Sequence, residues 1–154
     1  MKGRLHGFTL IELVVTISII AILAAVALPR YIALQTQARI AKTQAIYGNV
    51  RSASALAHAM ALATNTVTSG PATVFMEGQP VTLINGYPTA DGAGIIVATQ
   101  LNSLSDSIIF SGGGANAGDT LQIDTSGGTL GLCTVTYKAP TNPGFSPGVG
   151  INTN

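Results

Sequence analysis

The stretch Gly7–Arg30, GFTLIELVVTISIIAILAAVALPR, decides the N-terminal part of the fold. Between Phe8 and Leu28 it contains a single charged residue, Glu12. A helix of these 21 residues would be about 31 Å long, which matches the hydrocarbon core of a bilayer. The stretch therefore predicts a transmembrane helix with a carboxylate one turn from its start.

The residues before this stretch indicate its orientation. Lys2 and Arg4 precede the apolar run, and the positive-inside tendency places a basic flank in the cytoplasm. The chain that follows the helix is then expected on the opposite side of the membrane. Arg30, just past the apolar run, weakens this preference without reversing it.

Glu12 needs a physical explanation, because a carboxylate costs about 2.5–3.5 kcal/mol at a bilayer centre and less near an edge. No Lys or Arg lies between Phe8 and Leu28 to pair with it. Cleavage after Gly7 would create a partner, since the new α-amine of Phe8 would lie one helical turn away on the same face. Gly7 has no side chain, so a protease can approach its backbone closely. The helix dipole also favours a negative charge near the N-terminus.

The run Gly7-Phe8-Thr9-Leu10-Ile11-Glu12-Leu13 resembles the processing motif of type IV pilins and the related pseudopilins. The resemblance implies that a membrane prepilin peptidase cleaves after Gly7 and N-methylates Phe8. It also implies a role in filament assembly for Phe8, Glu12 and Pro29, with the glutamate pairing with the N-terminus of a neighbouring subunit. Pro29 lies where such pilins usually carry a proline.

Three further runs, LQTQARIAKTQAIYGNVRSASALAHA, NGYPTADGAGI and LCTVTYKAP, are similar to the mannose-sensitive haemagglutinin class of type IV pilins. Pilins of this group commonly close a C-terminal loop with a disulfide. Cys133 is the only cysteine of the chain, so that intramolecular disulfide is absent. Cys133 is expected to be a buried strand residue, because it lies in an alternating apolar run.

The helical pattern continues past Pro29 to about Ala63. Pro29 is expected to bend the helix or to mark a small offset, because proline removes a helical hydrogen bond. Two stripes recur at spacings of three or four residues, one expected to face a sheet and the other to face neighbouring helices. They are Ile46, Val50, Ala53, Ala57 and Met60, and Leu34, Ala38, Ala41 and Ala45.

The remainder of the chain predicts a small antiparallel sheet. Asp91 is expected to cap a short helix that extends through Asn102, and Pro140–Asn154 is expected to be an irregular tail rich in Pro and Gly. The sequence thus predicts an α+β fold in which a long N-terminal helical spine packs on a β-sheet head. The candidate strands are Ala72–Met76, Pro80–Ile84, Ser107–Phe110, Thr120–Asp124 and Leu130–Tyr137.

The expected division is a prepilin leader at 1–7, a transmembrane and filament-core helix at 8–28, an amphipathic continuation at 29–63 and an extracellular head at 64–154. The resemblance implies the major subunit of a type IV pilus supporting surface adhesion or motility. The chain would wait in the bacterial inner membrane with its head in the periplasm. It would then polymerise with other copies, through the pilus assembly platform, into an extracellular pilus. Three alternatives stay open: a type II secretion pseudopilin, a minor pilin, and a soluble secreted binding protein cleaved after Ala27.

Charge is unevenly distributed along the chain. All charges between positions 30 and 51 are positive, whereas five acids and one lysine follow, so the stem is basic and the head acidic. Neighbouring copies can therefore attract one another from stem to head, although single surface charges are more often simply solvated. The net charge of +1 gives no field that would attract nucleic acid.

No catalytic, cofactor or metal site is expected. His58 lies among alanines without an acid or second histidine at ligand spacing, so it is interpreted as a structural or surface residue. Asp119 and Asp124 flank a candidate strand, and exposed turn residues are a better interpretation of them than a calcium site. Nothing in the sequence resembles a nucleophile elbow.

Overall fold

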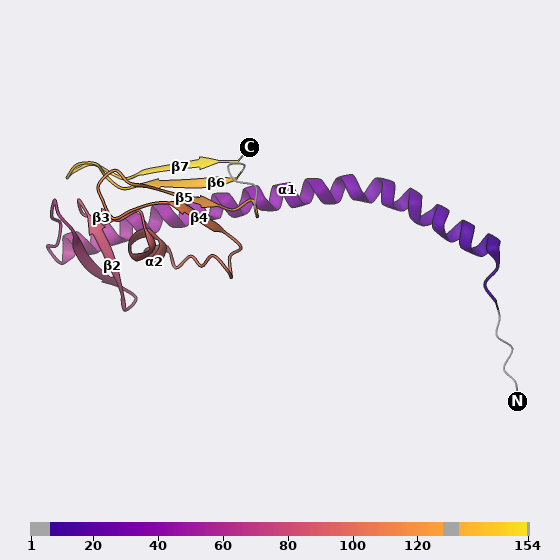
Figure 1. The fold of residues 1–154 in the computed structure, drawn as a ribbon, viewed down its shortest axis with the longest axis horizontal. Coiled ribbons are helices and arrows are strands. Elements are labelled where there is room, and N and C mark those ends of the chain that lie inside the picture. Colours follow the sequence, from indigo (N-terminus) through magenta and orange to yellow (C-terminus); the bar gives the residue numbers. More distant parts are fainter. Residues whose placement is uncertain (1–6, 128–132, 154) are drawn as a thin grey trace, which may run out of the picture. The chain divides into compact units, whose positions relative to one another are not determined.

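The computed structural model describes residues 7–127 and 133–153 and divides into two compact units, one up to Ala38 and one from Arg39 onward. Helix α1, Leu10–Ala63, is continuous over 54 residues and belongs to both units (Figure 1). Its helical conformation continues through Pro29 without a break. Most of the predicted leader lies outside the described residues.

The end of α1 is capped. Asn65 has a positive φ of 53°, and the Thr66 amide donates to the Ala61 carbonyl at 2.9 Å. This reversal satisfies carbonyls of the last turn in the way a C-terminal glycine usually does. The predicted end of the helix at about Ala63 is confirmed.

The described residues after α1 form two antiparallel sheets joined by a short helical segment. The three-stranded sheet has the order β1-β2-β3 and the four-stranded sheet the order β4-β5-β6-β7. The segment comprises the π-helical turn η1, Gly92–Ile96, and α2, Val97–Thr99. The strands are β1 (Ala72–Met76), β2 (Gln79–Ile84), β3 (Tyr87–Pro88), β4 (Ile109–Gly112), β5 (Thr120–Asp124), β6 (Thr134–Lys138) and β7 (Gly148–Asn152).

The part of α1 in the second unit packs against both sheets. Ile46 and Val50 share a buried cluster with residues of the four-stranded sheet, including Tyr137. Ala57 and Ala61 share a second cluster with residues of β1 and β2. The α+β fold and the sheet-facing stripe are therefore confirmed, with Ala61 rather than Met60 as the more buried residue of the last turn.

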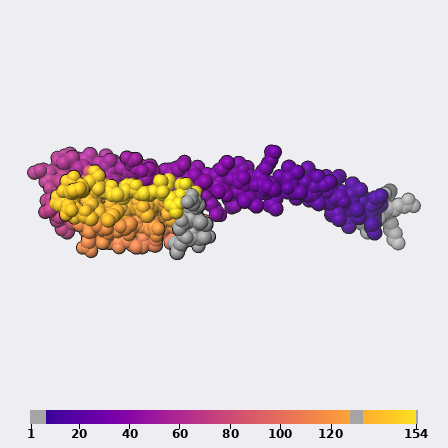
Figure 2. All heavy atoms as spheres, turned by 90° about the horizontal axis from the view of Figure 1, so that it is seen from above, coloured from indigo at the N-terminus to yellow at the C-terminus, as the bar shows by residue number. Residues whose placement is uncertain are grey.

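The prediction of an irregular tail at Pro140–Asn154 is confirmed for residues 140–147 and wrong for residues 148–152, which form strand β7. Strand β7 pairs with β6 from Thr134↔Asn152 to Lys138↔Gly148, and Figure 2 shows this yellow segment forming an outer face of the second unit. Glycine lowers strand propensity, which hides the strand in the sequence. A Cβ at Gly150 would lie 2.6 Å from the Thr136 hydroxyl oxygen, so any other residue at this position would force the Thr136 side chain to move.

Two other elements differ from expectation. Asp91 caps the helical segment as predicted, its Oδ1 accepting from the Gly94 amide at 2.8 Å. The segment ends at Thr99 rather than Asn102 because Gln100 adopts a left-handed conformation with φ 56°. Strand β4 starts at Ile109, two residues later than predicted. For β6, residues 130–132 of the predicted strand lie outside the described residues.

Candidate functional site

The predicted cleavage site lies in open backbone at the N-terminus of α1. Gly7, Phe8 and Thr9 precede the first helical residue, Leu10, and adopt no regular structure. Phe8 is 72% exposed, and no atom lies within 4 Å of where a Cβ on Gly7 would be. The peptide bond between Gly7 and Phe8 lies outside regular structure between exposed residues, which leaves it accessible to a protease.

Thr9 and Glu12 start the helix together. The Glu12 amide donates to the Thr9 hydroxyl oxygen at 3.3 Å, and the Thr9 hydroxyl donates to Glu12 Oε2 at 3.5 Å. The Thr9 carbonyl accepts from the Leu13 amide at 3.2 Å, the first bond of the helix. Thr9 therefore caps the helix as the Thr of a Thr-x-x-Glu capping box does, although Glu12 accepts from the Thr9 hydroxyl instead of the Thr9 backbone amide. The sequence analysis missed this role of Thr9, although the spacing in FTLIE is its signal.

The first part of α1, from Leu10 to Leu28, consists almost entirely of exposed apolar residues, with Glu12, Thr16 and Ser18 as its polar residues. The helix contains an 18-residue window of mean hydropathy 2.7 with none of it buried, which makes it long and apolar enough to cross a membrane. The hydroxyls of Thr16 and Ser18 donate back to Glu12 and Val14 carbonyls at 2.9 and 2.7 Å. The few polar groups of this segment are therefore satisfied within the helix, as burial in lipid or in a helix bundle requires.

Glu12 is the single acid on this apolar surface. Its side chain is exposed, and the helix N-terminus favours its charge. In the uncleaved chain the Phe8 nitrogen is part of a peptide bond and carries no charge; the predicted cleavage after Gly7 would turn it into a charged amine near Glu12. Pro29 lies inside the helix and is exposed, which leaves its side chain open to other molecules.

The remaining candidates have structural roles. His58 Nδ1 lies 2.8 Å from the Gly86 carbonyl oxygen, and its ring stacks on Tyr87 with centroids 4.1 Å apart. Cys133 is buried with a free thiol. Asp119 Oδ2 accepts from the Asn116 amide at 2.9 Å and so serves its own turn. In the described ranges no group of three His, Cys, Asp or Glu residues is arranged to hold a metal ion.

A family model and a curated relative each match part of the chain. Residues 4–28 match the family model of the prokaryotic N-terminal methylation motif. Over 54 residues the chain is 52% identical to the type IV narrow pilus major component PilA5 of Thermus thermophilus, covering 35% of this chain and 47% of that protein. The chain thus spans about half the length of this curated relative. No solved structure matches the chain significantly.

Proposed function

We propose that this chain is the major structural subunit of a type IV pilus, made as a prepilin. The observation that carries the proposal is the methylation motif at residues 4–28, which includes the exposed apolar start of α1 and its one carboxylate, Glu12. The partial match to a major pilus component supports a major rather than a minor subunit. In this role the chain has a structural function and no enzymatic one.

The methylation motif and the accessible N-terminus support the proposed processing. A prepilin peptidase cleaves the Gly7–Phe8 bond and methylates the new amine of Phe8. The subunit then resides in the inner membrane through the apolar part of α1, with its N-terminus cytoplasmic and its head in the periplasm. The assembly platform extracts it into the growing extracellular pilus.

The proposed assembly uses burial for cohesion and charge for register. Bundling the exposed apolar segments of many copies removes large side chains such as Leu10 and Ile11 from contact with lipid or water. Within this bundle the Glu12 carboxylate pairs with the Phe8 amine of an adjacent subunit. A desolvated charge pair adds little net stability, but it specifies one axial register because every other register leaves both charges unpaired.

Intact-mass measurement of sheared surface fibres tests the proposal. A fibre subunit that begins at Phe8 and carries one added methyl group is the expected result. A soluble product that begins at Leu28 would mean that the first 27 residues are an export signal, and the pilin proposal would fail. Low abundance in the fibres would indicate a minor pilin, and a short periplasmic filament that drives export would indicate a pseudopilin.

Assignment to the mannose-sensitive haemagglutinin class is a finer proposal that rests on the three sequence runs alone. Whether the pilus serves adhesion or twitching is tested by deleting the gene for this chain and measuring surface attachment and spreading separately. Loss of attachment with normal spreading would support an adhesive role.

A further inference from the structure

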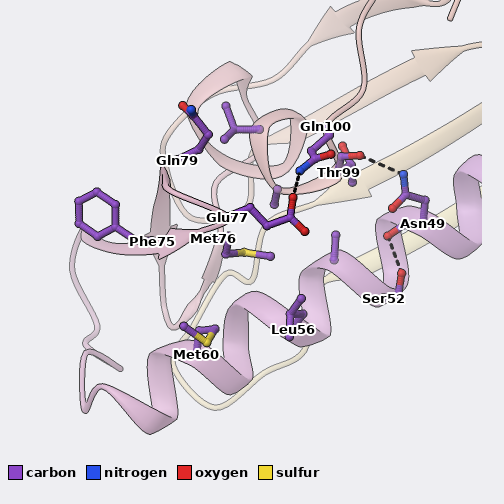
Figure 3. Close-up of a pocket in the computed structure, with 13 residues that line it drawn as sticks. Asn49, Ser52, Leu56, Met60, Phe75, Met76, Glu77, Gln79, Thr99 and Gln100 are labelled. Atoms are coloured by element: carbon purple, nitrogen blue, oxygen red, sulfur yellow. Dashed lines mark hydrogen bonds between the residues drawn. The ribbon is translucent and has the colours of Figure 1, made fainter.

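A groove in the second unit opens between α1, the β1–β2 hairpin and α2 (Figure 3). It has a volume of about 370 Å³, and Leu56 and Met60 of α1 line it together with Met76 of β1. Leu56 remains 56% exposed at its edge. A concave apolar surface of this kind is typical of a binding site, because its side chains are only partly removed from water.

Hydrogen bonds hold the walls of the groove in place. Asn49 Nδ2 on α1 donates to the Thr99 carbonyl oxygen at 3.0 Å. The next residue, Gln100, donates through Nε2 to the carboxylate of Glu77, and Figure 3 shows these two side chains pointing toward one another. The groove is therefore formed before any partner arrives, which lowers the entropic cost of binding.

Glu77 gives the groove its charge. The other acids in the described part of the head are at most half-exposed and accept backbone amide hydrogen bonds within their own turns: Asp91, Asp106, Asp119 and Asp124. Glu77 is exposed, and its carboxylate accepts a hydrogen bond from the neutral amide of Gln100. The groove thus combines apolar walls with one carboxylate that is available to a cation.

The backbone at Glu77 carries a conformational cost. Glu77 and Gly78 occupy the two-residue turn between β1 and β2 with φ values of 49° and 80°. Asn85 and Gly86 form the next turn with nearly the same values, 53° and 81°. Asparagine is the favoured first residue of such a turn and glutamate is not. A glutamate at this position is therefore better explained by a contact it makes than by the turn it forms.

The part of the chain that complements this groove is the start of the amphipathic region of α1. Arg30 and Leu34 are four residues apart on one helical face, with Tyr31 and Ala38 beside them. All four side chains are exposed, Leu34 by 63%. Arg30 has no ion pair with any described residue, whereas Lys42 donates to backbone carbonyls and Arg51 stacks on Tyr47. Arg39 lies on a different face from Leu34.

We propose that the groove binds the Arg30–Ala38 segment of a second copy, with Leu34 between Leu56 and Met60 and Arg30 paired with Glu77. The inference rests on the proposed function, since it describes a contact within the filament. Leu34 and Leu56 belong to one continuous helix, so the contact joins two copies. The contact joins two different surfaces, so each copy can bind one neighbour through its groove and another through its Arg30–Ala38 segment. Repetition of this contact builds an open filament rather than a closed dimer.

Disulfide cross-linking between two co-expressed copies tests the contact directly. One copy carries Leu34→Cys and the other Leu56→Cys, and the fibres are oxidised and analysed without reducing agent. We expect a cross-linked dimer of the two copies. The matched control replaces Leu56→Cys by Leu104→Cys, since Leu104 is 90% exposed and does not line the groove, and should give no dimer. Fibres of normal yield in which neither pair cross-links would overturn the inference.

Charge exchange provides a second test with the full chain. Glu77→Arg and Arg30→Glu should each lower fibre yield by roughly tenfold at unchanged cellular subunit level, because each places like charges in contact. The double variant should recover most of the yield, and Lys138→Glu, away from the groove, should leave it unchanged. Failure of the double variant to recover would contradict the pairing. If the fibres contain methylated Phe8 and their yield is the same in all these variants, this inference fails and the proposed function stands. If the unmodified chain is not found in fibres, both fail.

Discussion

Glu77 and Gln100, 23 residues apart in sequence, are both in the left-handed backbone region and are hydrogen bonded to each other. Their φ values are 49° and 56°. Glu77 turns the β1–β2 hairpin, and Gln100 ends α2 through a bond from its amide to the Val97 carbonyl at 3.1 Å. Two non-glycine residues in an unfavourable conformation therefore meet at one rim of the groove. Such positions are commonly retained for function rather than for stability.

The variant Glu77→Asn is expected to stabilise the fold while it weakens assembly. Asparagine tolerates the left-handed conformation that costs an ordinary residue about 1–2 kcal/mol, so the midpoint of thermal unfolding should rise by a few degrees. Circular dichroism of the full chain in detergent measures this change. Gly78→Ala in the same turn should lower the midpoint, because its φ of 80° disfavours a Cβ even though the space is empty. A lower midpoint for Glu77→Asn would show that the glutamate serves the turn itself.

Tyr137 should make the stability of the head fall at alkaline pH. Its side chain is fully buried and its hydroxyl donates to the Pro88 carbonyl at 2.7 Å. Burial raises the pKa of Tyr137 above its ordinary value of about 10. Below pH 10 both folded and unfolded states keep the proton, so there is no pH effect. Above it the unfolded state alone loses the proton, and stability should fall by up to about 1.4 kcal/mol per pH unit.

Comparison of Tyr137→Phe with Tyr31→Phe isolates this effect. Tyr137→Phe leaves the Pro88 carbonyl without its partner and should cost about 1–3 kcal/mol at neutral pH, while reducing the loss of stability above pH 10. Tyr31 is 66% exposed, so its variant should match the parent chain at both pH values. Denaturant unfolding at pH 7 and pH 11 measures both quantities. Equal alkaline losses in all three chains would contradict the assignment to Tyr137.

The helix and much of the sheet could be predicted because their signals are local. Alanine-rich periodicity predicts α1 as far as Ala63, and alternating apolar residues predict Ala72–Met76 and Thr120–Asp124 with the observed bounds. Strand β7 could not be predicted, since glycine lowers strand propensity and Gly150 is favoured only by its close approach to Thr136 on the neighbouring strand. That approach becomes visible only when both strands are paired.

The processing motif and the groove also differ in whether the sequence predicts them. The processing motif around Gly7 and Glu12 consists of consecutive residues, so the sequence alone locates it. Its cleavage and its role in assembly stay predictions. The groove depends on Met60, Met76 and Gln100, which come from three separate elements. No spacing in the sequence indicates that they converge, and the positive φ of Glu77 is set by the hairpin register.

Glu12→Gln should separate the two roles of Glu12. The amide of residue 12 still donates to the Thr9 hydroxyl, so the helix start is retained, but the negative charge is lost. We expect normal membrane insertion and cleavage, with fibre yield reduced by roughly tenfold or more, because the Phe8 amine of the neighbour is left unpaired. Thr9→Val, which removes the cap and costs about 1 kcal/mol of helix stability, should alter yield much less. Abundant normal fibres from Glu12→Gln, quantified by shearing and immunoblotting, would rule out the register mechanism.

Substitution by alanine should have different effects on stability at Gly94 and at Gly92, which lie two residues apart in η1. A Cβ on Gly94 would lie 2.2 Å from the Thr89 carbonyl oxygen and 2.6 Å from its nitrogen. This backbone cannot retreat without breaking the 2.9 Å bond from the Ile95 amide to the same carbonyl. Gly94→Ala should therefore destabilise the head by about 3 kcal/mol. Gly92, two residues earlier in η1, is exposed with no atom near its Cβ position, so Gly92→Ala should be neutral or stabilising by up to about 1 kcal/mol. Denaturant unfolding of both variants measures the difference, and equal stabilities would mean that η1 does not pack on Thr89 as described.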